Sequence, residues 1–183
     1  MTWRPLFHNH ISLSPWSLSY RLRLLVWEVT WQCLCVWTPK PFNPWRLFIL
    51  RIFGTKISGT PFVHQRALID HPWNLCMHHR ACLGDRSHAY CLAKIELLSH
   101  STVAQEVYLC TGTHDFTLDN LPLITRPITI GENAFIGARA FLMPGVTVGS
   151  RSIVGACSVV TRSVPPHTIV AGNPAKPIPH ILS

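Results

Sequence analysis

Aliphatic residues recur every six positions along most of this chain. The steps run Ile57, Val63, Ile69, Leu75, then after a two-residue slip Leu83, Ala89, Ile95, Ser101, Val107, and after a loop Ile130, Ile136, Leu142, Val148, Val154, Val160. A helix repeats every 3.6 residues and a flat strand every two, so neither explains this period. The spacing predicts a triangular coil in which each step forms one short strand and one corner, roughly five coils in all.

Small residues stand at fixed places within the same repeat. Four positions after each of the last six steps lie small or β-branched residues, namely Ala134, Ala140, Val146, Ser152, Ser158 and Val164. Glycine directly follows four of these steps, at 131, 137, 149 and 155. We expect the small residues to fill the turns, and glycine and asparagine to adopt the backbone φ values that the corners require.

The chain before the repeat reads as helical over residues 18–54. One apolar stripe at helical spacing, Leu22, Leu25, Val26, Val29, Cys33 and Val36, predicts a buried face, and a second stripe is formed by Leu24, Trp27, Trp31 and Leu34. The prolines of "TPKPFNP" interrupt the helix, Asn43 is a candidate cap for a second helix, and Gly54 a candidate end. We expect residues 1–55 to form a helical cap and residues 56–183 to form the coiled domain.

The second helix offers an alternative to simple capping. It places Arg46 and Arg51 beside Trp45, Phe48, Ile49 and Ile52, a basic aromatic surface suited to a membrane interface. A bilayer-spanning helix is not expected, because "LRLLVWEVTWQCLCVW" carries Arg23, Glu28 and Gln32 and falls short of ~20 apolar residues. The start "MTWRPLFHNHISLSPW" lacks the apolar core of a signal peptide.

Composition narrows the possible partners. The chain is 48% apolar and 13% charged, which is typical of a folded protein. Its net charge of +8 suits an anionic partner, although generic surface charge explains this value equally well. Because the chain has no nucleic-acid-binding motif, we expect no nucleic-acid partner. The seven cysteines are odd in number and contain no C-x-x-C pair, which favours reduced thiols in a cytoplasmic protein. The basic aromatic helix adds the alternative that this cytoplasmic protein binds peripherally to the inner membrane.

The C-terminal half carries a specific resemblance. The segment "IGENAFIGARAFLMPGVTVGSRSIVGACSVVTRSVPPHTIVAGNPAKPI" resembles the hexapeptide-repeat acyltransferases, and "PWNL", "YLCTGTHDF" and the helix ending in "RLFILRIFG" resemble their colanic acid biosynthesis acetyltransferase subgroup. The resemblance covers about residues 18–179. It implies a mainly β fold, a left-handed parallel β-helix with N-terminal α-helices. It also implies a homotrimer that transfers an acetyl group from acetyl-CoA to a hydroxyl of a sugar, an exopolysaccharide unit or a lipid-linked intermediate.

A loop at residues 113–129 interrupts the repeat and carries the candidate chemistry. A loop of this length without a periodicity of its own is usually functional. The imidazole of His114, at its root, can accept a proton from a hydroxyl near neutral pH and return it to a leaving thiolate. We therefore predict His114 as the general base of a direct transfer in a ternary complex. For Asp115 we expect either a contact to the acceptor or a role in orienting the loop.

The resemblance also implies residues for acetyl-CoA. Ala138 and Ala156 match positions beside the pantetheine arm, Thr161 and Arg162 match positions near the nucleotide, and Lys176 lies toward phosphate. For the two alanines, ordinary filling of a corner is an equally good explanation.

Two alternatives remain open on the sequence. Ala93 stands where the family commonly has Asp before Lys94, which leaves room for an inactive trimeric scaffold or binding protein. A zinc enzyme like the γ-class carbonic anhydrases would need a histidine at Asp119 to pair with His114. A cluster at Cys76, His78, His79 and Cys82 lacks the spacing of structural zinc sites, so no metal is expected.

Overall fold

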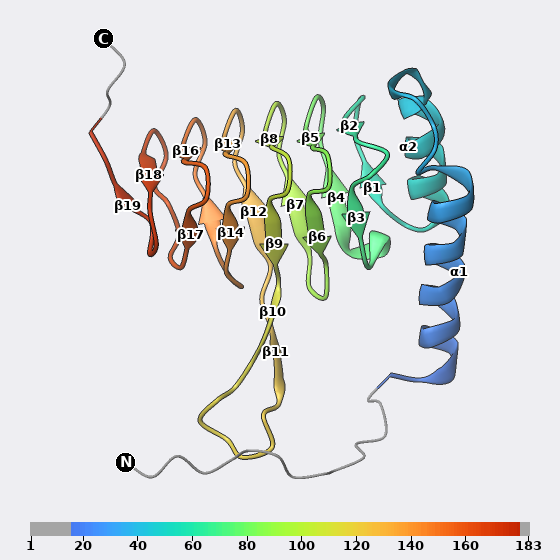
Figure 1. Ribbon diagram of the computed structural model, residues 1–183, viewed down its shortest axis with the longest axis horizontal. Coiled ribbons are helices and arrows are strands. Elements are labelled where there is room, and N and C mark those ends of the chain that lie inside the picture. The colour runs from blue at the N-terminus through green and yellow to red at the C-terminus, as the bar shows by residue number, and fades with distance from the viewer. Residues whose placement is uncertain (1–15, 180–183) are drawn as a thin grey trace.

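The computed structural model describes residues 16–179 and confirms a mainly β, left-handed parallel β-helix with three flat walls (Figure 1). The first wall contains β1 (Lys56–Ile57), β4 (Leu75–Met77), β7 (Ile95–Leu97), β12 (Ile128–Ile130) and β15 (Thr147–Val148). The second contains β2 (Phe62–Val63), β5 (Cys82–Leu83), β8 (Thr102–Val103), β13 (Phe135–Ile136), β16 (Ile153–Val154) and β18 (Ile169–Ala171), with antiparallel β19 (Lys176–Pro177) at its end. The third contains β3 (Leu68–Ile69), β6 (His88–Tyr90), β9 (Tyr108–Cys110), β14 (Phe141–Leu142) and β17 (Val159–Val160).

Strand register shows where the six-residue pattern was wrong. Ile57 pairs with Met77 and Met77 with Leu97, so the first two coils are 20 residues long, two more than three hexads. In the third coil the strand residues in register with this row are therefore Leu97, Val103 and Leu109. The predicted Ile95, Ser101 and Val107 lie two positions earlier in the chain and are also buried. The second wall holds six parallel strands rather than five. The clear periodicity after Ile130 is confirmed.

The corners use glycine for a different reason than predicted. Most left-handed φ values belong to other residues, including Arg80, Arg86, His100, Glu106, Asn133, Arg139, Arg151, Cys157 and His167. The repeat glycines instead allow successive coils to approach closely. A Cβ at Gly137 would lie 2.6 Å from the backbone N of Ala156 in the next coil, and no side chain fits there.

The N-terminal helices cover the open end of the first coil (Figure 1). They are α1 (Leu18–Leu34) and α2 (Asn43–Ile52), joined through the short helix η1 (Lys40–Phe42); a further turn, η2 (Pro72–Asn74), precedes β4. The predicted buried face of α1 is wrong, since Leu22, Leu25, Val26, Val29 and Cys33 are exposed. The second stripe faces inward instead: the indole N–H groups of Trp27 and Trp31 donate to the carbonyls of Ile69 and Ala67, at 2.5 and 3.2 Å.

Helix α2 satisfies the backbone of β2, which has no neighbouring coil on that side. Asn43 does not cap the helix as predicted; its amide donates to the Pro61 carbonyl and accepts from the Val63 N–H, at 2.8 and 3.0 Å. Arg46, predicted at the surface, is fully buried. Gly54 follows the end of α2 with φ of +95°, as its predicted role requires.

Arg46 holds the cap together through neutral acceptors. Its guanidinium donates to the carbonyls of Val63, Pro39 and Lys40 and to the hydroxyl of Thr38, at 2.9 to 3.2 Å. No carboxylate pairs with it among the described residues. A buried charge of this kind is tolerated because four of its N–H groups donate to oxygen atoms.

We expect Arg46→Met to destabilise the protein by about 3 to 5 kcal/mol, because it leaves buried carbonyls without donors. Urea unfolding measures the change in the free energy of unfolding. Arg51→Met makes the same chemical change at an exposed position of the same helix and should cost less than about 1 kcal/mol. Equal effects of the two substitutions would contradict this role for Arg46.

Candidate functional site

A two-stranded hairpin replaces the corner between the third and first walls of one coil. Strands β10 (Gly112–His114) and β11 (Leu123–Thr125) pair antiparallel, with Gly112 opposite Thr125 and His114 opposite Leu123. The hairpin follows β9 and leads back into β12, and it projects well beyond the prism (Figure 1). The long loop predicted from the sequence is therefore an ordered arm.

Thr111 fixes the root of the hairpin. Its buried hydroxyl donates to the Tyr90 carbonyl at 2.6 Å and accepts from the Ala93 N–H at 3.0 Å. Gly112 follows in a space where a Cβ would lie 2.6 Å from the Leu92 side chain. Ala93 thus lies directly against the root of the arm.

The His114 side chain is exposed on the hairpin, and its Nδ1 lies 2.7 Å from the Leu121 carbonyl oxygen. A carbonyl only accepts, so Nδ1 carries the proton in this bond. In the neutral imidazole, Nε2 then keeps its lone pair and can accept a proton. Sequence reasoning did not find the orienting group, because it is a backbone oxygen seven residues away, and any residue at position 121 supplies one.

Asp115 organises the tip of the arm. Its Oδ1 accepts from the backbone N–H of Thr117 at 2.9 Å and from the Thr117 hydroxyl at 2.6 Å. These bonds favour the charged form and lower the pKa of the Asp115 carboxyl. One carboxylate oxygen therefore serves the turn itself, and among residues 16–179 no group forms a hydrogen bond with Oδ2.

The residues predicted for the cofactor lie along two edges of the prism. Ala138 follows β13 and Ala156 follows β16, so both stand at the edge between the second and third walls, where the Cys157 N–H donates to the Ala138 carbonyl at 2.8 Å. Lys176 pairs with Ala171 at the same edge. Thr161 and Arg162 follow β17 and lie instead at the edge from which the hairpin leaves. All but Ala138 are exposed, and Ala138 is half-buried.

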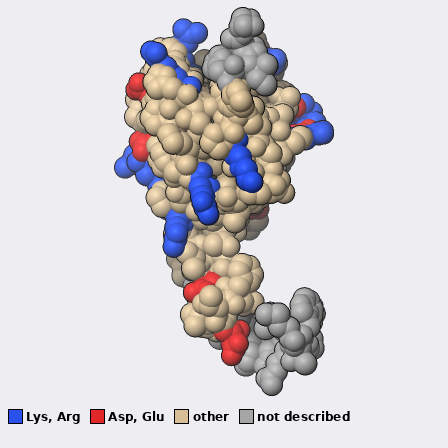
Figure 2. Space-filling view, turned by 90° about the vertical axis from the view of Figure 1, so that its left-hand side faces the viewer, with Lys and Arg blue, Asp and Glu red and all other residues tan. Residues whose placement is uncertain are grey.

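Positive charge gathers at the end of the prism where the chain finishes. Figure 2 shows Lys and Arg side chains spread over this end, with acidic side chains mainly at its margin and on the protruding arm. An anionic ligand would meet a favourable field there.

Comparison with known proteins agrees with the six-residue repeat. Residues 127–162 match the family model described as bacterial transferase hexapeptide (six repeats). The chain is 35% identical over 154 residues to the "Putative colanic acid biosynthesis acetyltransferase WcaF" of Escherichia coli (strain K12), covering 84% of this chain and 85% of that protein. The chain belongs to the hexapeptide-repeat acetyltransferases.

Solved structures share the architecture of this acetyltransferase. A maltose O-acetyltransferase from Clostridium difficile 630 is 27% identical and superposes with a TM-score of 0.75 over 91% of this chain and 90% of that one. A hexapeptide-repeat acetyltransferase from Vibrio cholerae O1 biovar eltor, complexed with acetyl coenzyme A, is 20% identical with a TM-score of 0.80 over 91% of each chain. The latter likeness concerns the fold alone.

Proposed function

We propose that this acetyltransferase moves an acetyl group from acetyl-CoA to a hydroxyl of a sugar or of a sugar-containing exopolysaccharide intermediate. Family membership supports the acetyl transfer, and the related proteins known as maltose and galactoside acetyltransferases support a sugar acceptor. The observation that carries the mechanism is the bond from His114 Nδ1 to the Leu121 carbonyl, since it leaves Nε2 as a proton acceptor on an exposed arm.

His114 acts as general base and then as general acid. Its Nε2 takes the proton of the acceptor hydroxyl while that oxygen attacks the thioester carbonyl carbon. The tetrahedral intermediate collapses, the carbon–sulfur bond breaks, and the leaving thiolate takes the proton back from Nε2. The products are an acetyl ester and the free thiol of coenzyme A. Asp115 contributes Oδ2 as an acceptor for a second hydroxyl of the sugar, while Oδ1 maintains the turn with Thr117.

A complete site requires two chains. His114, Thr161 and Arg162 lie toward one edge of the prism, whereas Ala138, Ala156 and Lys176 lie at another, across the third wall. The arm also presents apolar side chains to solvent: Phe116 is 78% exposed, and Leu118 and Leu123 are exposed as well. A homotrimer with closed symmetry would pack each arm against a neighbouring chain and bring the two kinds of edge together.

In our proposal, acetyl-CoA lies along the contact between these two edges of neighbouring chains. Ala138 and Ala156 form what we call the alanine ridge. They leave room for the pantetheine arm, because a larger side chain at either corner would occupy that space. The exposed residues Thr161, Arg162 and Lys176 meet the nucleotide and its phosphates.

His114→Ala tests the reaction. We expect it to lower kcat for acceptor-dependent thiol release from acetyl-CoA by about 10²- to 10⁴-fold, because it removes the general base. The binding of acetyl-CoA should persist, since the substitution leaves the alanine ridge unchanged. A thiol-release assay with maltose and other sugars as acceptors measures the rate, and calorimetry measures the binding.

His100→Asn is a suitable control, because this exposed corner histidine has φ of +61°, which asparagine tolerates, and lies outside the arm. It should retain the parent rate. Unchanged turnover in His114→Ala would eliminate the proposed base. Tight acetyl-CoA binding by the parent protein with no turnover on any sugar would favour the inactive scaffold.

We further propose that the N-terminal helices contact an anionic membrane surface, where a lipid-linked acceptor would be found. The outer helix surface consists of the exposed apolar residues Leu18, Leu22, Leu25 and Val29 of α1 and Trp45, Phe48 and Ile52 of α2. Exposed Arg21 and Arg51 adjoin it in sequence, and the chain carries a net charge of +8. Such a surface suits a helix lying in the interface. Neither helix is long or apolar enough to cross a bilayer.

Flotation with vesicles tests the membrane contact. We expect the protein to float with vesicles containing phosphatidylglycerol, and the Leu22→Glu/Phe48→Glu double variant to remain at the bottom of the gradient. Ile178→Glu changes an exposed apolar residue at the far end of the chain and should float as the parent does. Absence of flotation by the parent protein would refute the membrane contact and leave acetyl transfer untouched.

A further inference from the structure

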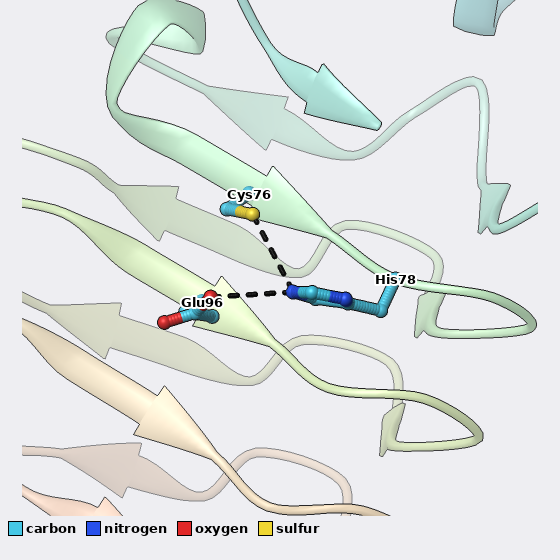
Figure 3. Close-up of side chains that lie close together, drawn as sticks. All are labelled: Cys76, His78 and Glu96. Atoms are coloured by element: carbon cyan, nitrogen blue, oxygen red, sulfur yellow. Dashed lines mark hydrogen bonds and ion pairs between the residues drawn. The ribbon is translucent and has the colours of Figure 1, made fainter. Parts of the chain in front are cut away.

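A thiol, an imidazole and a carboxylate meet on the outside of the first wall, on strands other than those of the hairpin that carries His114. Cys76 on β4, His78 just after it and Glu96 on β7 each offer a ligand atom, and these atoms all lie within 4.8 Å of one another. Figure 3 shows the three side chains turned toward one another across the two strands. Among residues 16–179, this is the one group of three such side chains close enough to hold a metal ion.

The coil length produces this cluster. Because the coil here is 20 residues long, Cys76 pairs directly with Glu96 in the parallel ladder. His78, two residues after Cys76, points to the same face. The sequence spacing concealed the third ligand, since only the strand register brings Glu96 under Cys76. The histidine and cysteine that the sequence placed nearby, His79 and Cys82, are not part of the group.

The distances between the atoms fit a tetrahedral zinc centre. Cys76 Sγ lies 3.6 Å from His78 Nε2, and His78 Nε2 lies 3.2 Å from Glu96 Oε1. With Zn–S near 2.3 Å and Zn–N and Zn–O near 2.1 Å, a tetrahedron separates sulfur from nitrogen by about 3.6 Å and nitrogen from oxygen by about 3.4 Å. These two of the three ligand pairs are therefore within a few tenths of an ångström of the required separations, and the third pair, Cys76 Sγ and the Glu96 carboxylate, lies within 4.8 Å.

The supporting contacts leave the three ligand atoms available. His78 Nδ1 lies 3.3 Å from the Ser58 hydroxyl, which directs Nε2 toward the cluster. Lys94 Nζ holds the other oxygen of the Glu96 carboxylate, Oε2, at 2.8 Å. Ligands of protein metal sites are commonly oriented by hydrogen bonds of this kind. Two other histidines, His64 and His88, also pair with carboxylates, but neither pair gains a thiol.

A hollow of about 230 Å³ adjoins the cluster and gives access to it. Cys76 and Lys94 line this hollow together with Lys56, Trp73, Asn74 and Leu75. A zinc ion with three protein ligands keeps a fourth position, which water entering from the hollow can fill. Burial and the neighbouring Glu96 charge raise the pKa of the Cys76 thiol. A zinc ion must therefore displace the proton of the Cys76 thiol in order to bind the sulfur. By binding Glu96 as well, the ion neutralises the carboxylate charge that raises the pKa of this thiol.

We propose that Cys76, His78 and Glu96 bind a zinc ion that ties strand β4 to strand β7. The site is independent of acetyl transfer, in which none of its three ligands takes part. Its role is to join two successive coils of the prism.

Titration of the chelator-treated, full-length protein with Co²⁺, followed by displacement with Zn²⁺, tests the site. We expect one Co²⁺ per chain, with a thiolate-to-cobalt charge-transfer band in the near ultraviolet that Zn²⁺ abolishes. Cys76→Ser should remove the band, and Glu96→Gln should weaken binding by more than about tenfold. Zn²⁺ should raise the Tm of the parent protein but not that of Cys76→Ser.

Cys82→Ser is the matched control, because this half-buried thiol lies on β5 and faces Phe62 and Thr102 across the ladder instead of a carboxylate. It should keep both the band and the Tm increase. Equal Tm values of the metal-free parent and Cys76→Ser would establish that the substitution leaves the fold intact. Absence of stoichiometric binding, or an undiminished band in Cys76→Ser, would overturn the proposal whatever the protein's acetyltransferase activity.

Discussion

The parallel ladder between successive coils governs everything else in this molecule. Each strand of two or three residues pairs with the strand one coil away. Inward-facing aliphatic residues of these strands are buried inside the prism. Because the ladder satisfies the backbone along all three walls, the prism is regular and its outer faces are flat. A flat wall offers no deep cleft. In our proposal the catalytic group is therefore added where the ladder is interrupted, and within residues 16–179 the long interruption of the coil is the hairpin that carries His114.

The same constraint explains the two ends. The first coil has no preceding coil, so its backbone must find other partners, and Trp27, Trp31, Asn43 and Arg46 provide them. This use of the inward helix faces leaves the outward apolar residues of α1 and α2 exposed. Helical spacing alone did not reveal which stripe faced inward, because the helix is apolar on both. The indole N–H groups decided it, since they can serve the unpaired carbonyls of the coil whereas leucine and valine cannot.

The sequence predicted the coil well where the hexads are uniform and poorly where the coil is longer. After Ile130 every inward residue was correct, whereas between Ile95 and Val107 the extra two residues per coil shifted the strand positions. The candidate site was likewise only partly predictable from the sequence. His114 and the length of its loop were visible in the sequence, but the Leu121 carbonyl and the hydroxyl bridge of Thr111 depend on how the hairpin folds. Backbone acceptors have no residue signature, so sequence reasoning cannot find them. The pairing of Cys76 with Glu96 likewise follows from register alone.

In our proposal, the base on one chain works on acetyl-CoA held by Ala138 and Ala156 of a neighbouring chain. Subunit complementation tests it directly, by co-assembling His114→Ala chains with Ala156→Trp chains, each inactive alone. If every site joins the arm of one chain to the ridge of its neighbour, an equal mixture regains about one quarter of the parent activity in a closed symmetric assembly. A mixture that stays inactive, although the two kinds of chain assemble together, would contradict a site shared between chains.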